Sequence, residues 1–167
     1  GLRCVRCAKL HAVPSPKEHF LEACGACGAN LHVHNDIGWL RGRVTRATLA
    51  TSPHQGLWRY LPFLPVEGTS GLERLQVPAT PLLRAPALGR LAGLERLWLK
   101  DESRNPSASF KDRATVVALA AARERGVDVV AGASTGNAAS STACFAARLG
   151  MKAVIFVPEA APSAKVS

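Results

Sequence analysis

The stretch Leu97-Trp-Leu-Lys-Asp-Glu-Ser-Arg-Asn-Pro-Ser-Ala-Ser-Phe-Lys-Asp-Arg113 decides how the rest of the chain is interpreted. It begins as an apolar strand, breaks at Asn105-Pro106, and then predicts a helix with Lys111 in its first turn. Ser109 is a candidate N-cap for this helix. Asp112 follows three residues later, in the position of a capping box.

Lys111 occupies a position that disfavours its charged form. A helix N-terminus carries about half a positive charge, and Arg113 stands two residues further on. Both lower the pKa of an ammonium group, and burial would lower it further. A lysine with a lowered pKa is a nucleophile toward carbonyl groups, so Lys111 is a candidate catalytic residue for imine chemistry. The competing interpretation is a solvated lysine that pairs with Asp112.

The composition sets the broad class of protein. A length of 167 residues predicts one domain, or one small domain with part of another. The apolar content of 47% is enough to bury a core, and no apolar run approaches the length of a transmembrane helix. The first residues show no signal-peptide pattern. We therefore expect a cytoplasmic protein with no membrane partner.

The chain is strongly basic, with 21 lysine and arginine residues against 12 acidic ones and a net charge of +9. This charge suits either nucleic acid or a small anionic molecule that is drawn to a positive cleft. The densest basic patch is formed by Arg41, Arg43 and Arg46, and no series of aromatic residues accompanies it. Charge alone leaves both partners open.

Two cysteine pairs near the N-terminus predict a metal site. Their spacing lets four thiolates surround one zinc ion as a tetrahedron, and a glycine such as Gly28 supplies the tight turn. Four cysteines leave no open coordination position, so the zinc would be structural. The alternative is a knuckle without metal or with a disulfide. The metal-ligating residues are expected to be Cys4, Cys7, Cys24 and Cys27.

The chain divides into three parts by its sequence pattern. Residues 1–36 form the cysteine knuckle, in which His32 and His34 are expected to be exposed strand residues rather than further ligands. Residues 37–79 are interrupted by prolines and are expected to be a connecting arm that packs across the following domain. Residues 80–167 form that domain, with Cys144 expected in its core.

From residue 80 onward, strands alternate with helices, which predicts an α/β fold with a parallel sheet. Lys111 and the segment Gly132-Ala-Ser-Thr-Gly-Asn137 both follow predicted strands. Ligands of such sheets bind beyond the carboxyl ends of the strands, so we expect the two to face one crevice. The predicted strands are 81–84, 94–100, 127–131 and 152–157. The predicted helices are 109–125 and 138–148, and residues 88–94 are expected to form a brief turn or helix.

The segment 132–137 has a chemistry of its own. Its small residues allow close approach to the backbone, and the helix that follows offers free N–H groups to an anion such as a substrate carboxylate. Asn137 is suited to hydrogen-bond a phenolic oxygen or an amide. The alternative is a capped strand–helix turn that binds no ligand.

Taken together, the cysteine knuckle, the block Lys100–Arg113 and the block Gly132–Asn137 resemble threonine synthases, within the fold-type II family of pyridoxal-phosphate enzymes. Their order and spacing also match, as do Gly56–Pro62 and Thr80-Pro81. The resemblance covers essentially the whole chain. It implies a tryptophan-synthase-β-like α/β fold preceded by a zinc-ribbon knuckle.

The resemblance also implies the chemistry. Pyridoxal 5'-phosphate would be held as an imine on Lys111, which would later move protons, and Phe110 would pack near the cofactor. Asn137 would hydrogen-bond the oxygen of the cofactor's ring hydroxyl. A small anionic amino-acid substrate, O-phospho-L-homoserine, would react with water to give L-threonine and phosphate, and the full-length enzyme is expected to be a homodimer. The substrate carboxylate would be held by Ser134, Thr135 and Gly136.

The sequence departs from the family pattern at several positions. Ser107-Ala108 stands where a Thr-Gly pair is usual, Ala114 replaces a glycine, and Ala138 replaces a threonine near the reacting substrate. A complete enzyme of this kind is also longer and contains a glycine-rich loop for the cofactor phosphate. We therefore expect this chain to be incomplete and inactive alone.

Two other functions stay open. Another fold-type II lyase, such as a threonine dehydratase or a cysteate-synthase-like enzyme, is compatible with Ala138. A zinc-ribbon module that binds nucleic acid would account for the charge and the knuckle, although not for Lys111 or the segment 132–137.

Overall fold

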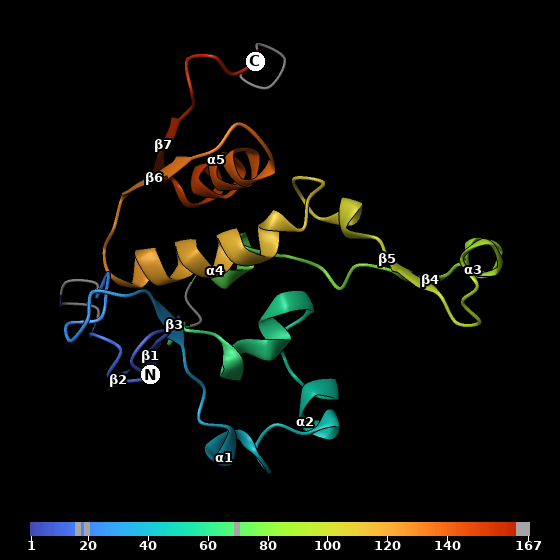
Figure 1. Cartoon of the computed structure of the whole chain (residues 1–167), viewed down its shortest axis with the longest axis horizontal. Helices are drawn as coiled ribbons and strands as arrows, with labels where there is room; N and C mark the ends of the chain where they lie inside the picture. The colour runs from blue at the N-terminus through green and yellow to red at the C-terminus, as the bar shows by residue number, and fades with distance from the viewer. Residues whose placement is uncertain (16–17, 19–20, 69–70, 163–167) are drawn as a thin grey trace.

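The computed structural model of the chain describes residues 1–15, 18, 21–68 and 71–162. Its central element is helix α4 (Lys111–Glu124). The cysteine knuckle lies near the carboxyl end of α4, and a hairpin projects beyond its amino end (Figure 1). The arm lies on one side of α4, and a strand–helix–strand unit lies on the other (Figure 1). Among the described residues, no helix has the length and apolar content needed to cross a membrane.

The knuckle is a three-stranded antiparallel sheet. Strand β1 (Leu2–Cys4) lies between β2 (Leu10–His11) and β3 (Leu31–Val33). Each cysteine pair closes a tight turn, in which the backbone N–H four residues after the first cysteine donates to that cysteine's carbonyl. The residue after each pair therefore adopts a positive φ, 60° at Ala8 and 68° at Gly28.

The arm consists of short helical pieces rather than long elements. These are α1 (Ile37–Leu40), α2 (Arg46–Ala50) and the 3₁₀ helices η1 (Gly56–Phe63) and η2 (Leu72–Arg74). Asp36 and Thr45 cap α1 and α2 with their side chains. Gly56 has a φ of 59°, and a Cβ there would lie 2.0 Å from the carbonyl oxygen of Val77. Only glycine allows the start of η1 to approach Val77, near the end of the arm, so closely.

The hydrophobic core is shared between the arm and the two long helices. The arm's Trp58 is 1% exposed, and its indole N–H donates to the carbonyl of Leu75 over 2.8 Å. The arm therefore packs across the following helices, as the sequence predicted. The buried core comprises Trp58, Val66, Leu75 and Val77 of the arm, Val116, Leu119 and Ala120 of α4, and Phe145 of α5.

The last part of the described chain is a parallel βαβ unit, which confirms that part of the sequence prediction. Strand β6 (Val129–Ala133) pairs in parallel with β7 (Lys152–Phe156), and α5 (Asn137–Leu149) connects them. Gly150 ends α5 in the left-handed conformation, as a helix C-cap requires. The predicted strand 127–131 begins two residues later than expected.

The expectation of one parallel sheet from residue 80 onward is wrong for its first two strands. Strand β4 (Leu82–Arg84) pairs antiparallel with β5 (Trp98–Lys100) as a separate two-stranded sheet. The connection contains only the seven-residue helix α3 (Pro86–Ala92), which is followed by Gly93 as its left-handed C-cap. A parallel crossover needs a helix long enough to return along the sheet. With only two turns of helix, the chain folds back as a hairpin, which projects from the molecule (Figure 1).

Ala108, in the loop before α4, has a φ of 56° although it is not glycine. A left-handed conformation costs an alanine roughly 1–2 kcal/mol. We expect Ala108→Gly to raise the free energy of unfolding by about 1 kcal/mol, which urea unfolding would measure. Ala118→Gly, at an exposed position inside α4, is the matched control and should lower it by about 1 kcal/mol. A loss of stability in Ala108→Gly would contradict the assignment of strain.

Candidate functional site

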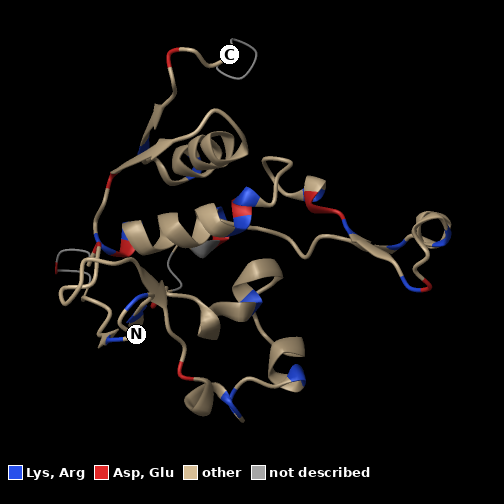
Figure 2. Cartoon of the chain, viewed as in Figure 1, with Lys and Arg blue, Asp and Glu red and all other residues tan. Residues whose placement is uncertain are grey.

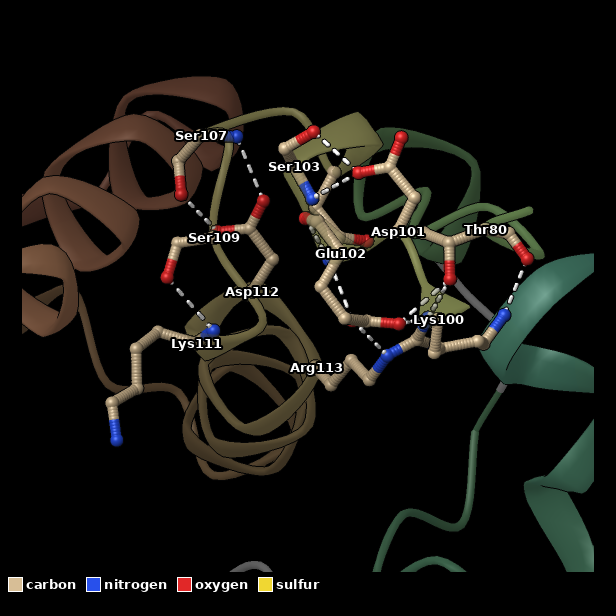
Figure 3. A network of polar contacts seen from close by, with 11 residues as sticks. Thr80, Lys100, Asp101, Glu102, Ser103, Ser107, Ser109, Lys111, Asp112 and Arg113 are labelled. Carbon is tan, nitrogen blue, oxygen red and sulfur yellow. Dashed lines mark hydrogen bonds and ion pairs between the residues drawn. The ribbon is translucent and has the colours of Figure 1, made fainter. Parts of the chain in front are cut away.

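Lys111 is the first residue of α4 and is exposed. Its side chain points away from the network of hydrogen bonds around Asp112 and Glu102 (Figure 3). The ammonium nitrogen lies 4.7 Å from the centre of the Phe110 ring, which is itself 58% exposed. Lys111 is therefore an accessible amine beside an aromatic face. The alternative in which it pairs with Asp112 is not what the structure shows, because the Asp112 carboxylate is occupied elsewhere.

The predicted capping box at the start of α4 is wrong. The residue in the N-cap position is Phe110, which makes no side-chain cap. Ser109 still serves the helix end, since its hydroxyl accepts a hydrogen bond from the N–H of Lys111 over 3.2 Å. Asp112 turns inward instead of back toward Ser109, because its carboxylate has better donors in the interior.

Asp112 has no exposed surface. Its carboxylate accepts hydrogen bonds from the backbone N–H of Ser107 over 2.8 Å and from the hydroxyl of the same residue. A third bond comes from the hydroxyl of Ser141 in α5, over 2.6 Å. One carboxylate thus joins the loop before α4, the first turn of α4 and the second turn of α5.

Arg113 points to the other side of the helix, toward the loop that follows β5 (Figure 3). Its guanidinium donates two hydrogen bonds to Glu102 of η3 (Glu102–Arg104), at 2.7 and 2.8 Å, and one to the hydroxyl of Thr80 at 3.0 Å. The sequence prediction treated Arg113 as a charge acting on Lys111. In the folded chain, Glu102 balances that charge.

The contacts of Glu102 tie the whole loop together. The Arg113 guanidinium lowers the pKa of this carboxyl to about 2, with Thr80 and Asn105 adding in the same direction against burial. Asn105 donates to Glu102 over 2.8 Å, and the Lys100 ammonium donates to the carbonyl of Thr80. These contacts anchor both ends of the segment that carries Lys111.

The segment that follows β6 forms the start of α5. Asn137 is the first residue of the helix rather than a loop residue, and it is exposed. Gly136 before it is extended, and the space where a Cβ would stand is open. The N–H of Ser134 donates to the carbonyl of Phe156 over 3.1 Å, and its hydroxyl accepts from the N–H of Gly136 over 3.1 Å. A ligand can therefore approach the backbone here, beside half-buried Thr135.

The structure brings the beginnings of α4 and α5 together. The 2.6 Å bond between Asp112 and Ser141 fixes the first turn of α4 to the second turn of α5. The start of α5 lies on the same side of the molecule as the start of α4 (Figure 1). This arrangement is the one that a shared crevice for Lys111 and residues 134–137 requires. The ligand-binding roles of these residues remain predictions.

The four cysteines of the knuckle converge on one point. Their sulfur atoms all lie within 4.8 Å of one another, and all four are free thiols, so the cluster has the donor set of a metal site. The thiols shift one another in opposite directions: the pKa of Cys4 is lowered to about 6, first of all by the backbone N–H of Cys7. The backbone N–H of Lys9 lowers the pKa of Cys7, but the neighbouring thiols and burial outweigh it and raise that pKa to about 11. Thiolate is the form that binds metal. The cluster comprises Cys4, Cys7, Cys24 and Cys27, and among the described residues no histidine joins it.

The structure confirms the prediction for His32 but differs from those for His34 and Cys144. His32 is exposed as expected, whereas His34 lies just beyond β3 and is half-buried. Cys144 is half-buried in α5 rather than part of the buried core. The partnership of Asp112 with Ser141 was missed, because no spacing rule connects residues on two different helices.

The charges are distributed over many elements rather than concentrated in one surface. Lysine and arginine occur on the knuckle, the arm, the hairpin and both long helices (Figure 2). Opposite charges meet where α4 begins, beside η3 (Figure 2). Arg113 and Glu102 form an ion pair here at 2.7 Å, so a basic side chain at this place is neutralised rather than free for a phosphate.

With this geometry in view, comparison with known proteins gives a consistent result. Residues 74–167 match the family model described as "Pyridoxal-phosphate dependent enzyme". The chain belongs to this family, and its α/β part, with Lys111 and the start of α5, lies within the matched residues.

The particular relatives are threonine synthases. The chain is 37% identical to the threonine synthase of Methanocaldococcus jannaschii and 31% identical to that of Methanosarcina acetivorans, over 157 residues in each case. These matches cover 94% of this chain, so they extend through the arm and into the region of the knuckle, well ahead of residue 74. They cover 37% and 36% of the relatives, so the chain spans little more than a third of their length. The threonine synthase of a Bacillus species is 42% identical over 103 residues, 62% of this chain and 29% of the relative.

The Glu102 contacts generate a prediction about pH. The pKa of Glu102 falls from 4.5 to about 2 on folding, so its contribution is fully present above pH 4.5 and is lost as the pH falls toward 2. Glu102→Gln should lower the free energy of unfolding by about 2 kcal/mol at neutral pH, since it removes a charged hydrogen-bond acceptor. Urea unfolding at several pH values would show the difference from wild type shrinking in acid.

The matched control is Glu95→Gln, which neutralises an exposed carboxylate between α3 and β5. It should leave the unfolding free energy nearly unchanged across the same pH range. A Glu102→Gln effect of constant size from neutral pH to acid would show that the ion pair with Arg113 is not its cause.

Proposed function

We propose that the protein is a threonine synthase that converts O-phospho-L-homoserine and water into L-threonine and phosphate. The observation that carries the proposal is the juxtaposition of an exposed lysine at the start of α4 with the start of α5, within a chain that belongs to the pyridoxal-phosphate dependent family. The relatives at 37% and 31% identity are named threonine synthase, and their matches extend beyond the family-matched residues, through the arm and into the region of the knuckle. This second point favours the particular reaction over others in the family.

The residues present fit pyridoxal phosphate at this end of the molecule. Lys111 offers an accessible amine, Phe110 an exposed aromatic face beside it, and Gly136 an open backbone. When bound, the cofactor would supply an electron sink for breaking bonds next to the amino-bearing carbon of the substrate. Lys111 would hold it covalently and, once freed, would take up and return protons at its amine nitrogen.

The start of α5 would bind the anionic end of the substrate. Backbone N–H groups at a helix N-terminus attract a carboxylate, and the small residues Ser134, Thr135 and Gly136 leave room for it. Asn137, exposed in the first turn, would orient the cofactor by hydrogen-bonding its ring hydroxyl oxygen. Ala138 lacks a hydroxyl, so any hydroxyl needed next to the reacting carbon must come from another residue.

A second candidate reaction within the family is that of a threonine dehydratase or a cysteate-synthase-like enzyme. The specific observation in its favour is Ala138, at the position where the family usually has threonine. Release of phosphate from O-phosphohomoserine separates the candidates. A complete gene product that binds the cofactor and deaminates threonine, but releases no phosphate, would establish the second reaction instead.

Lys111 provides the direct test of the proposal. In the complete gene product, Lys111→Arg keeps the positive charge but cannot form the covalent link at neutral pH, so phosphate release should fall at least about a hundredfold. The cofactor's absorbance should also shift, because the lysine-bound form is lost. Lys152→Arg, an exposed lysine of β7, is the matched control and should retain full activity. Normal phosphate release by Lys111→Arg would rule out its assigned role.

The knuckle is proposed to hold one structural zinc ion. Elemental analysis of the purified protein should find about one zinc per chain, consistent with a single tetrahedral site. Cys7→Ser, at the exposed cysteine of the cluster, should lose the metal and lower the melting temperature, because metal binding contributes to folding. Cys144→Ser should keep the zinc. Wild-type protein without zinc, or equal zinc in both variants, would refute the site.

A further inference from the structure

The contact between α4 and α5 includes, besides its apolar core, a hydrogen bond between two fully buried polar side chains. Asp112 and Ser141 are both 0% exposed, and the hydroxyl donates to the carboxylate over 2.6 Å. This is the length of a charge-assisted O–H···O⁻ bond, which is stronger than a bond between neutral groups. A buried carboxylate without such donors would be strongly destabilising. The buried carboxylate of Asp112 therefore requires a hydrogen-bond donor at the position of Ser141.

Each partner stands next to a residue of the candidate site. Asp112 directly follows Lys111, and the two side chains diverge, one into the interior and the other outward (Figure 3). Ser141 is four residues after Asn137, so both lie on one face of α5, just over one helical turn or about 6 Å apart along its axis. The bond therefore sets the distance between the start of α5 and the backbone of Lys111.

The loop before α4 is held by the same carboxylate. Ser107 donates to it through both its backbone N–H and its hydroxyl. An ionised carboxylate accepts at all its lone pairs and donates nothing, so it accommodates three donors at once. An asparagine in its place would turn an NH₂ group toward one of those donors. The geometry requires the charged residue, rather than any polar residue of that size.

We propose that Asp112 is a positioning residue, which holds the start of α5 against the start of α4 and so fixes residues 134–137 relative to Lys111. The inference rests on the proposed function only in that Lys111 carries the cofactor. Asp112 touches neither cofactor nor substrate. Its effect passes through Ser141 to Asn137. Substitution of Asp112 would leave the amine of Lys111 intact, but residues 134–137 would no longer be held in position beside it.

The main test uses Ser141→Ala in the complete gene product, because this variant removes one bond and leaves those of Asp112 to Ser107 in place. The dissociation constant for pyridoxal phosphate, measured by absorbance or fluorescence titration well below the melting temperature, should rise about tenfold, as expected for loss of one charged hydrogen bond. Asp112→Asn should raise it at least as much. Ser140→Ala, an exposed serine of the same helix, is the matched control and should leave it unchanged.

A purely structural role makes a different prediction. It would lower the melting temperature of Ser141→Ala while leaving the dissociation constant at the wild-type value, and that result would overturn the proposal. Positioning also predicts non-additivity with Asn137→Ala, since Ser141 acts through this residue. The double variant should bind the cofactor about as weakly as Asn137→Ala alone. Independent, multiplying losses would likewise count against the proposal.

Cofactor binding, rather than turnover, is the measured quantity, so the result does not depend on the substrate. If O-phosphohomoserine releases no phosphate but Ser141→Ala weakens cofactor binding as expected, the proposed reaction fails while the positioning role stands. If phosphate is released normally and Ser141→Ala binds the cofactor as wild type does, the positioning role fails while the reaction stands.

Discussion

The burial of one carboxylate at the start of α4 is the constraint on which the arrangement of the site depends. Asp112 is wholly enclosed, and every donor that compensates its charge comes from a different piece of chain or from the loop just before it. Removing a charge from water is costly unless hydrogen bonds replace the hydration. The loop, α4 and α5 must therefore keep their relative positions for the carboxylate to be tolerated at all.

A second constraint is apolar and acts from the opposite side of α4. The arm inserts Trp58 and Val77 against Val116 and Phe145, so that residues far apart in the sequence share one core. Gly56 makes this possible, because its missing side chain lets the start of η1 lie against Val77 near the end of the arm. The long helices are thus fixed by packing on the arm's side and by hydrogen bonds at their amino ends. Together these contacts fix the starts of α4 and α5, which carry Lys111 and residues 134–137, more firmly than the short strands alone would.

The segment Leu97–Arg113, which leads from β5 into α4, shows how much of the candidate site could be predicted from the sequence. The order strand, break and helix was predictable, because the apolar run and Asn105-Pro106 punctuate the chain locally. The spacing of the cysteines likewise predicted four thiols that do converge. The capping box was not formed, although its pattern was correct. Ser109 and Asp112 satisfy a local rule, but Asp112 makes stronger bonds with Ser107 and Ser141 than with its own helix end.

The sequence by itself determined the local units: the knuckle, the helices α4 and α5, the parallel pair β6–β7, and the placement of Lys111 in a first turn. These follow from turns, caps and periodicity, which act over a few residues. Only the tertiary structure decided that β4 and β5 pair antiparallel, that Glu102 balances Arg113, and that the two helix starts meet. The physical reason is that burial and charge compensation depend on neighbours in space, which the chain brings together only when it folds.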